Sequence, residues 1–76
     1  MPFSKETIQS VWEKGEIVAD YDAKRFRKDE GGSWIRRWGY GAGDVKLGWK
    51  IHHIIPESDG GGNELSNLRP LQWNNR

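Results

Sequence analysis

The chain contains no cysteine, and this absence narrows the ways in which so short a sequence can hold a fold. A chain of 76 residues buries only about 60% of the surface that its unfolded form exposes, so small domains often rely on disulfides or cysteine-bound zinc. Both devices are excluded here. Five Trp, two Tyr and two Phe supply apolar surface instead, since each ring buries roughly 150–250 Å². The sequence therefore predicts a single domain, residues 1–76, with one aromatic core.

The first residues have the pattern of a helix with a defined start. Ser4 is a favoured N-cap residue, and Phe3 before it is placed to pack against Ile8 as a hydrophobic staple. Apolar residues continue at helical spacing, and Gly15 is expected to end the helix. We expect this helix to belong to the core rather than to a functional site.

A short turn and a strand are expected in the middle of the chain. Residues 21–26 are consistent with one helical turn capped by Asp22. Residues 33–38 mix β-forming aromatic residues with basic ones and lie between glycines, which is the composition of a strand bounded by turns.

The last third of the chain predicts a second group of elements. Residues 48–55 favour a strand that ends at Pro56, and residues 57–66, which include three successive glycines, favour a loop alone. A short strand is expected over 68–71, and a further helix is expected to begin within 73–76. The whole pattern predicts an α+β fold.

Charge is unevenly distributed along the chain, although the net charge is only +1. Residues 1–23 sum to −3, residues 24–50 to +5 and residues 51–76 to −1. The middle segment is therefore where an anionic partner would bind. The alternative is a solvated face over an aromatic core. The candidate nucleic-acid-binding residues of this segment are Lys24, Arg25, Arg27, Lys28, Arg36, Arg37 and Lys50.

The only two histidines, His52 and His53, are adjacent and lie in a β-forming run beside the glycine-rich loop. An imidazole with an ordinary pKa near ~6.5 can take a proton from water at neutral pH, which lysine and arginine cannot do. The alternative is a structural role for both histidines. Neighbours in a regular strand point to opposite faces, so the pair can serve one site only if the strand ends or twists there.

The segment Trp49–Trp73, W-x-I-H-H-I-x-P-x-S-x-G-G-x-N-x-L-S-N-L-R-P-L-Q-W, resembles the signature of the HNH endonucleases. Residues 12–15, 27–29 and 34–35 also resemble small bacterial and phage members of that family. The resemblance implies a ββα-metal motif over residues 49–76, in which a β-hairpin and a helix clasp one divalent ion, with residues 1–48 preceding it as the N-terminal helix and basic/aromatic segment. The implied activity is hydrolysis of DNA.

The resemblance also implies a role for individual residues. His53 corresponds to the general base and His52 to a metal ligand. Asn67 corresponds to the central asparagine, which ties the long loop and so orients the base; the alternative is an ordinary turn or cap. Arg69 lies beside the site and would clamp the scissile phosphate, or else form an ordinary surface salt bridge.

The sequence departs from the family signature at its end. The last position of the signature is His or Asn, and Arg76 occupies it here. Because arginine cannot ligate a cation, either the register shifts and Asn75 supplies the metal ligand, with Asn74 less favoured, or the site is incomplete. The sequence also stops at Arg76, so the final helix would be truncated after about one turn.

The implied cofactor is one divalent metal ion. Mg²⁺ or Mn²⁺ suits an open site with few protein ligands, and imidazole ligation also suits Zn²⁺ or Ni²⁺. Two histidines without cysteine argue against a closed structural zinc site.

Three functions remain open from the sequence. The first is a metal-dependent endonuclease that cuts DNA with little sequence preference, and the second is a catalytically degenerate HNH-fold module that binds DNA or protein. The third, an unrelated small interaction domain, predicts neither metal binding nor salt-dependent DNA affinity. The N-terminus lacks a signal-peptide pattern and no apolar run approaches ~20 residues, so a bacterial or phage-encoded cytoplasmic protein without membrane contact is expected. A larger protein partner is a further expectation, and the oligomeric state is left open.

Overall fold

The computed structural model describes residues 3–43 and 46–74. Within these ranges the chain forms one α-helix and two antiparallel two-stranded sheets, so the predicted α+β class is confirmed. The helix and strands are α1 (Lys5–Trp12), β1 (Phe26–Lys28), β2 (Trp34–Arg36), β3 (Trp49–His53) and β4 (Leu68–Gln72). Three short 3-10 turns accompany them: η1 (Arg37–Gly39), η2 (Glu57–Asp59) and η3 (Leu65–Asn67).

The start of α1 matches the sequence-based prediction. Ser4 is extended and its hydroxyl accepts a hydrogen bond from the backbone N–H of Thr7 at 3.1 Å, which confirms it as the N-cap. Phe3 and Ile8 both pack against the core cluster. The helix ends at Trp12, before Gly15 is reached. Gly15 serves close packing instead, since a methyl group there would lie 3.1 Å from the Cβ of Arg27.

The predicted turn before the first hairpin is present, and it is followed by a strand that was not predicted. The carbonyl of Asp22 accepts hydrogen bonds from the N–H groups of Arg25 and Phe26, while its carboxylate accepts one from Lys24 N–H at 2.9 Å. Phe26, assigned to the turn from sequence, begins β1. This strand pairs antiparallel with β2, in a register that places Phe26 opposite Arg36.

The strand predicted over 33–38 is shorter than expected. Only Trp34–Arg36 pair as β2, and the next three residues form η1. The chain turns here so that Gly39 can pass close to the backbone of Gly48, where a methyl group would come within 3.1 Å. That approach places the ring of Tyr40 edge-on to Trp49, with centroids 5.1 Å apart.

The second hairpin joins β3 to β4 through a long loop. The register places His53 opposite Leu68, His52 opposite Arg69 and Trp49 opposite Gln72. The strand predicted over 48–55 ends at His53, although the N–H of Ile54 still donates to the carbonyl of Asn67 at 2.8 Å in the same register. The strand predicted over 68–71 extends by one residue to Gln72.

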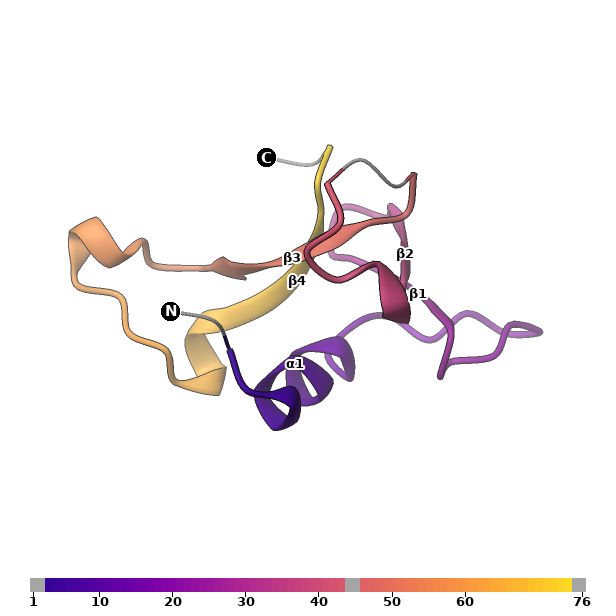
Figure 1. The fold of residues 1–76 in the computed structure, drawn as a ribbon, viewed down its shortest axis with the longest axis horizontal. Helices are drawn as coiled ribbons and strands as arrows, with labels where there is room; N and C mark the ends of the chain where they lie inside the picture. The colour runs from indigo at the N-terminus through magenta and orange to yellow at the C-terminus, as the bar shows by residue number, and fades with distance from the viewer. Residues whose placement is uncertain (1–2, 44–45, 75–76) are drawn as a thin grey trace.

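The loop between β3 and β4 is more ordered than its composition suggested. Residues 57–66 were expected to have no regular structure, but η2 and η3 form at its two ends. Lys14 fixes the second of these turns to the end of α1, since its ammonium donates to the carbonyl of Leu65 and, at 2.7 Å, to that of Leu68. In Figure 1 the loop, coloured orange, extends to one end of the long axis of the molecule.

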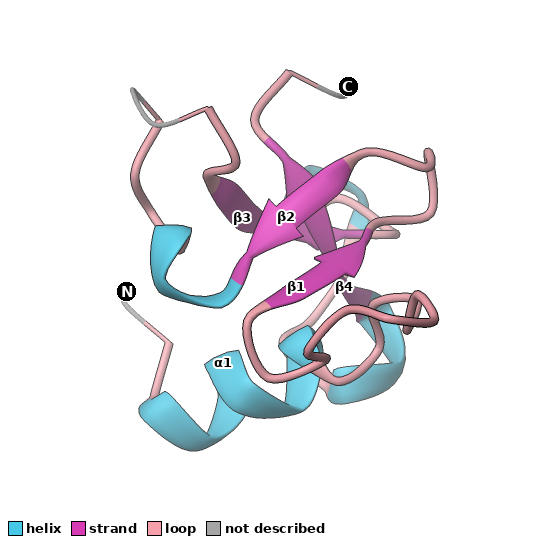
Figure 2. Cartoon of the chain, turned by 90° about the vertical axis from the view of Figure 1, so that its right-hand side faces the viewer, coloured by secondary structure: helices cyan, strands magenta, loops and turns pink. Residues whose placement is uncertain are grey.

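The core is aromatic, as the composition predicted. Trp12 and Trp49 are fully buried and their rings lie 5.5 Å apart. Val11, Ile35 and Leu68 complete the buried cluster, so α1, β2, β3 and β4 all contribute to it. Figure 2 shows the two sheets one in front of the other, with α1 along their lower edge.

The end of the chain does not add a helix within the described residues. Trp73 and Asn74 form a turn after β4, and the rest of the helix expected over 73–76 lies outside the described residues, with Asn75 and Arg76. In residues 3–43 and 46–74, the helical segments are too short and too polar to span a lipid bilayer.

Candidate active site

His53, at the last position of β3, has one specific side-chain partner. Its Nε2 atom lies 2.7 Å from the amide oxygen of Asn63, and its ring centroid lies 6.1 Å from that of Phe3. Glu57 joins these three residues in lining a small hollow. An amide oxygen only accepts hydrogen bonds, so a hydrogen bond between these two atoms requires Nε2 to act as the donor.

Asn67 is almost fully buried and fixes the base of the loop. Its amide oxygen accepts the N–H of Ile55 at 2.7 Å, and its amide nitrogen donates to the carbonyls of Ile55 at 3.1 Å and Gly62 at 2.9 Å. Asn67, directly before β4, is thereby joined both to Ile55, where the loop leaves β3, and to Gly62 within the loop. Gly61 completes the joint, since a methyl group there would lie 1.7 Å from the carbonyl oxygen of Ile55.

His52 occupies a different, more cationic environment than His53. It lies opposite Arg69 in the hairpin. The guanidinium of Arg69 forms an ion pair with Glu30. Burial lowers the pKa of His52 below its usual value of 6.5, and the charges of Arg69, Lys50 and His53 lower it further, whereas Glu30 opposes the change. His52 is therefore held as a neutral imidazole at neutral pH.

The two histidines are neighbours but face different partners. Because successive residues of a strand point to opposite faces, His53 projects toward Phe3 and Asn63 while His52 projects toward Arg69. Both histidines are half-buried at the end of β3.

The donor groups near His52 fit a metal only in part. A neutral imidazole is the form that ligates metals, and His52 provides one. In the described part of the chain, however, no group of three His, Asp or Glu side chains is placed to hold an ion. Asn75, the other predicted ligand, lies outside the described residues. An open site, completed by water or substrate oxygens, is the kind of site that this donor set supports.

The predicted DNA-binding residues differ in how free their charges are. Lys24, Arg25 and Arg36 are exposed. Arg27 is engaged inside the fold, where its guanidinium donates to the carbonyls of Ala23, Glu13 and Gly15. The remaining three lie over indole rings: Lys28 over Trp34, Arg37 over Trp38 and Lys50 over Trp73.

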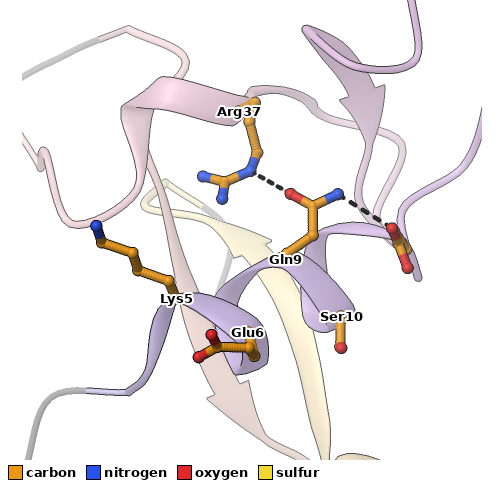
Figure 3. Close-up of a pocket in the computed structure, with 6 residues that line it drawn as sticks. Lys5, Glu6, Gln9, Ser10 and Arg37 are labelled. Atoms are coloured by element: carbon orange, nitrogen blue, oxygen red, sulfur yellow. Dashed lines mark hydrogen bonds between the residues drawn. The ribbon is translucent and has the colours of Figure 1, made fainter.

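A larger hollow than the one beside His53 lies away from the histidines. It has a volume of about 480 Å³ and lies between α1 and η1 (Figure 3). Its walls are Lys5, Glu6, Gln9, Ser10, Glu13 and Arg37. Its walls carry charges of both signs and it contains no histidine, so we do not assign the candidate active site to it on the basis of its size.

Sequence reasoning missed Asn63, which makes the closest contact to His53. The signal was an asparagine within the glycine-rich loop, ten residues from His53. Which loop residue folds back onto a strand depends on the loop conformation, and that conformation was not predictable from glycine content.

Comparison with known proteins gives one match. Residues 42–74 match the sequence model of the family described as HNH endonuclease. Searches of curated proteins and of solved structures found no significant match.

Proposed function

We propose that this chain, whose residues 42–74 match the model of the HNH endonuclease family, hydrolyses phosphodiester bonds of DNA with His53 as the general base. Members of this family generally bind DNA. The proposal includes a ββα-metal motif over residues 49–76, of which β3 and β4 are the described part.

The observation that carries the proposal is the contact between His53 Nε2 and the amide oxygen of Asn63 at 2.7 Å. With its proton held on Nε2, His53 presents Nδ1 as the atom that takes a proton from a water molecule. A positioned general base of this kind contributes roughly 10²–10⁴-fold to a reaction rate. Asn63 therefore acts as the positioning residue for the base.

Asn67 supports this arrangement from a distance. Its three hydrogen bonds to Ile55 and Gly62 fix where the loop leaves β3 and where it returns. Since Asn63 follows Gly62 directly, holding Gly62 also restricts where the Asn63 side chain can lie. We propose that Asn67 contributes to catalysis through this restraint and not by touching the substrate.

His52 is the described residue suited to hold the divalent ion, with Asn75 proposed as a second ligand. The ion, proposed to be Mg²⁺ or Mn²⁺, would supply positive charge to stabilise the phosphate and the departing oxygen. Zn²⁺ and Ni²⁺ also accept imidazole ligands and belong in any test. Arg69, opposite His52, is proposed to bind a phosphate oxygen in exchange for its ion pair with Glu30.

DNA is proposed to bind mainly through phosphate contacts. The exposed cations Lys24, Arg25 and Arg36 are the free charges of the middle segment. Phosphate contacts carry no sequence information, so little sequence preference is expected. Lys28, Arg37 and Lys50 would add charge beside their indole rings, whereas the hydrogen bonds of Arg27 indicate a mainly structural role.

A second function is favoured by one observation. The described residues hold no cluster of three metal-ligating side chains, which is what a DNA-binding module that has lost cleavage would show. This alternative predicts that the chain binds DNA but does not cut it, whichever metal ion is supplied.

The deciding experiment is a plasmid-nicking assay with Mg²⁺, Mn²⁺, Ni²⁺ or EDTA. His53→Ala and Ser66→Ala are prepared identically; Ser66 lies exposed in the same loop and serves as the matched control. Metal-dependent nicking that is lost only in His53→Ala supports the proposal. Equal nicking by His53→Ala contradicts the role of His53, and DNA binding without nicking under any condition supports the binding module.

A further inference from the structure

Trp38 is exposed to a degree that its packing does not explain. Its side chain is 76% exposed, the largest value among the large apolar side chains that the structure describes. Trp12 and Trp49, by contrast, are buried in the core. Trp38 lies in η1, within the basic middle segment, and lines a hollow together with Lys5 and Ile8 of α1.

Two hollows flank the Trp38 side chain. The first, about 390 Å³, is lined by Lys5, Ile8, Arg37 and Tyr40 together with Trp38. The second, about 370 Å³, is lined by Arg25, Phe26, Arg36 and Leu47 together with Trp38. Each hollow contains two cationic side chains, and no carboxylate lines either one within the described residues. The indole is therefore a wall shared by two cationic hollows.

One face of the indole is already occupied. The guanidinium of Arg37 lies 4.7 Å from the ring centroid of Trp38. Arg37 is held there because its Nε donates to the amide oxygen of Gln9 at 2.9 Å, and Gln9 in turn donates to Glu13 at 3.1 Å (Figure 3). This chain of contacts fixes the cation on the side of the first hollow.

The cations of the second hollow are freer. Among residues 3–43 and 46–74, the side chain of Arg25 has only an exposed ion pair with Asp22 at 3.8 Å, which contributes little in water. Arg36 has no side-chain hydrogen bond or ion pair to any residue in the ranges that the structure describes, and it is exposed. The second hollow thus offers an open aromatic surface beside two available guanidinium groups.

We propose that Trp38 is a stacking platform for an unpaired base of single-stranded DNA, with the neighbouring phosphates bound by Arg25 and Arg36. An aromatic surface between cations is the combination that binds single strands, because every base has a face that can stack and every link carries a negative charge. The bases of a duplex are already stacked on each other. The platform therefore selects unpaired DNA over duplex.

The position of the platform is compatible with the proposed catalytic site. Lys5 lines the first hollow, and Phe3, two residues earlier, lies beside the His53 ring. Both contacts are at the start of α1. The inference deepens the proposed function, and it rests on that proposal for the assumption that the bound polynucleotide is DNA.

The test measures binding of a fluorescein-labelled 12-nucleotide oligothymidine by anisotropy in EDTA, so that nothing is cut. A second probe of the same length carries abasic sites in place of the bases, and a third is a duplex. Trp38→Ala is compared with the parent chain and with Tyr21→Ala, since Tyr21 is an aromatic residue 55% exposed outside both hollows. Thermal unfolding of each variant checks that it is folded.

We expect Trp38→Ala to lose roughly five- to hundredfold in affinity for oligothymidine, the range that corresponds to removing the stacking of one base. Affinity for the abasic probe and for the duplex should change less than about twofold, because stacking makes no contribution there. Tyr21→Ala should bind all three probes as the parent does. Trp38→Phe, which keeps a smaller aromatic face, should show a smaller loss than Trp38→Ala.

Unchanged oligothymidine affinity in Trp38→Ala overturns the inference, and so does an equal loss on the abasic probe, which would indicate a charge or folding effect. The proposed function fails separately. If Trp38→Ala behaves as expected but the parent nicks no plasmid with any metal, only the cleavage proposal is wrong. If the parent nicks plasmid while Trp38→Ala binds every probe normally, only the stacking inference is wrong.

Discussion

Asn63 and Asn67 lie in the same loop, but their side-chain amides have different partners. The amide of Asn63 contacts an imidazole and is exposed, whereas the amide of Asn67 is buried and bonds only to backbone groups. The first contact positions a ring and the second fixes a loop conformation. Removal of Asn63 should therefore affect activity alone, whereas removal of Asn67 should affect stability and, through the loop, activity as well.

Replacing Asn63 with Ala should lower the nicking rate by roughly 10–100-fold, as loss of a partner that orients a functional histidine generally does. DNA affinity and stability should stay the same, because Asn63 is exposed and its removal leaves no buried group unpaired. Nicking rates and duplex binding of Asn63→Ala and Glu64→Ala check this. Asn63→Asp keeps an acceptor and should retain more activity; equal rates for all variants would show that Nε2 needs no partner.

Replacing Asn67 with Ala should lower the free energy of unfolding by about 1–3 kcal/mol, the usual cost of leaving buried hydrogen-bonding groups without partners. The groups affected are the N–H and carbonyl of Ile55 and the carbonyl of Gly62. Urea unfolding of the variant beside Ser66→Ala measures the effect. A midpoint equal to that of the parent would mean that water replaces the amide at no cost.

At the scale of elements, the β3–β4 hairpin depends on close approach between the two sides of its loop. Gly61 is the point of closest approach, where no side chain fits against Ile55. Gly43, by comparison, has room for a methyl group in ordinary contact with the Trp73 ring at 3.5 Å. Neither glycine has a positive φ, so the two differ in available space and not in backbone conformation.

This difference in space predicts that a glycine-to-alanine substitution changes stability much more at one position than at the other. Gly61→Ala should destabilise the chain by at least about 2 kcal/mol, because the backbone of Ile55 must move and the hydrogen bonds of Asn67 with it. Gly43→Ala should change stability by less than about 0.5 kcal/mol. Chemical unfolding of both variants is the measurement, and similar midpoints for the two would contradict the packing described at Gly61.

The sequence predicted elements best where local signals were strong. Ser4 predicted the start of α1 through a cap that acts within one helical turn, and the β-forming runs on either side of three glycines predicted the strands β3 and β4, whose pairing as a hairpin the family resemblance implied. The short strand β1 was missed because Phe26–Lys28 has too few residues for a period to show, and it is defined by its pairing with β2. Tertiary contact decided its structure.

The candidate site was predictable to a similar extent. Family resemblance singled out His52, His53, Asn67 and Arg69, and the structure shows the hydrogen bonds of Asn67 and the position of Arg69 opposite His52. The sequence left a surface salt bridge of Arg69 open as an alternative, and the structure shows one. Its partner Glu30 and the contact of Asn63 with His53 were not predictable, since each joins residues through a loop or between sheets. Their catalytic roles stay predictions.

At the scale of the whole molecule, the aromatic core joins α1, β2, β3 and β4. Trp49 lies at its centre, with Trp12 at 5.5 Å and Tyr40 at 5.1 Å. Burial raises the pKa of Tyr40 above its usual value of 10.0, because the packed ring is less well hydrated as a phenolate. The core therefore contains a group that responds to alkaline pH.

The folded chain should lose stability at high pH through Tyr40. Below pH 10 the phenol is neutral in both states and contributes no pH dependence. As pH rises above about 10, the unfolded chain ionises first, so unfolding is favoured until the folded-state pKa is passed. Urea midpoints at pH 8 and pH 11 should differ less in Tyr40→Phe than in the parent or in Tyr21→Phe. An identical loss in all three would assign the alkaline sensitivity to other groups.

The three hydrogen bonds of Asn67 also decide where this molecule can be enlarged. They close the loop at its base, so the exposed tip at residues 56–60 is free to lengthen without opening the hairpin. Closing a longer flexible loop costs only about 0.6 kcal/mol for each doubling of its length. A peptide grafted between Ser58 and Asp59 would be displayed beside His53, which makes the tip an insertion point for an epitope or for a domain that brings this chain to a chosen target.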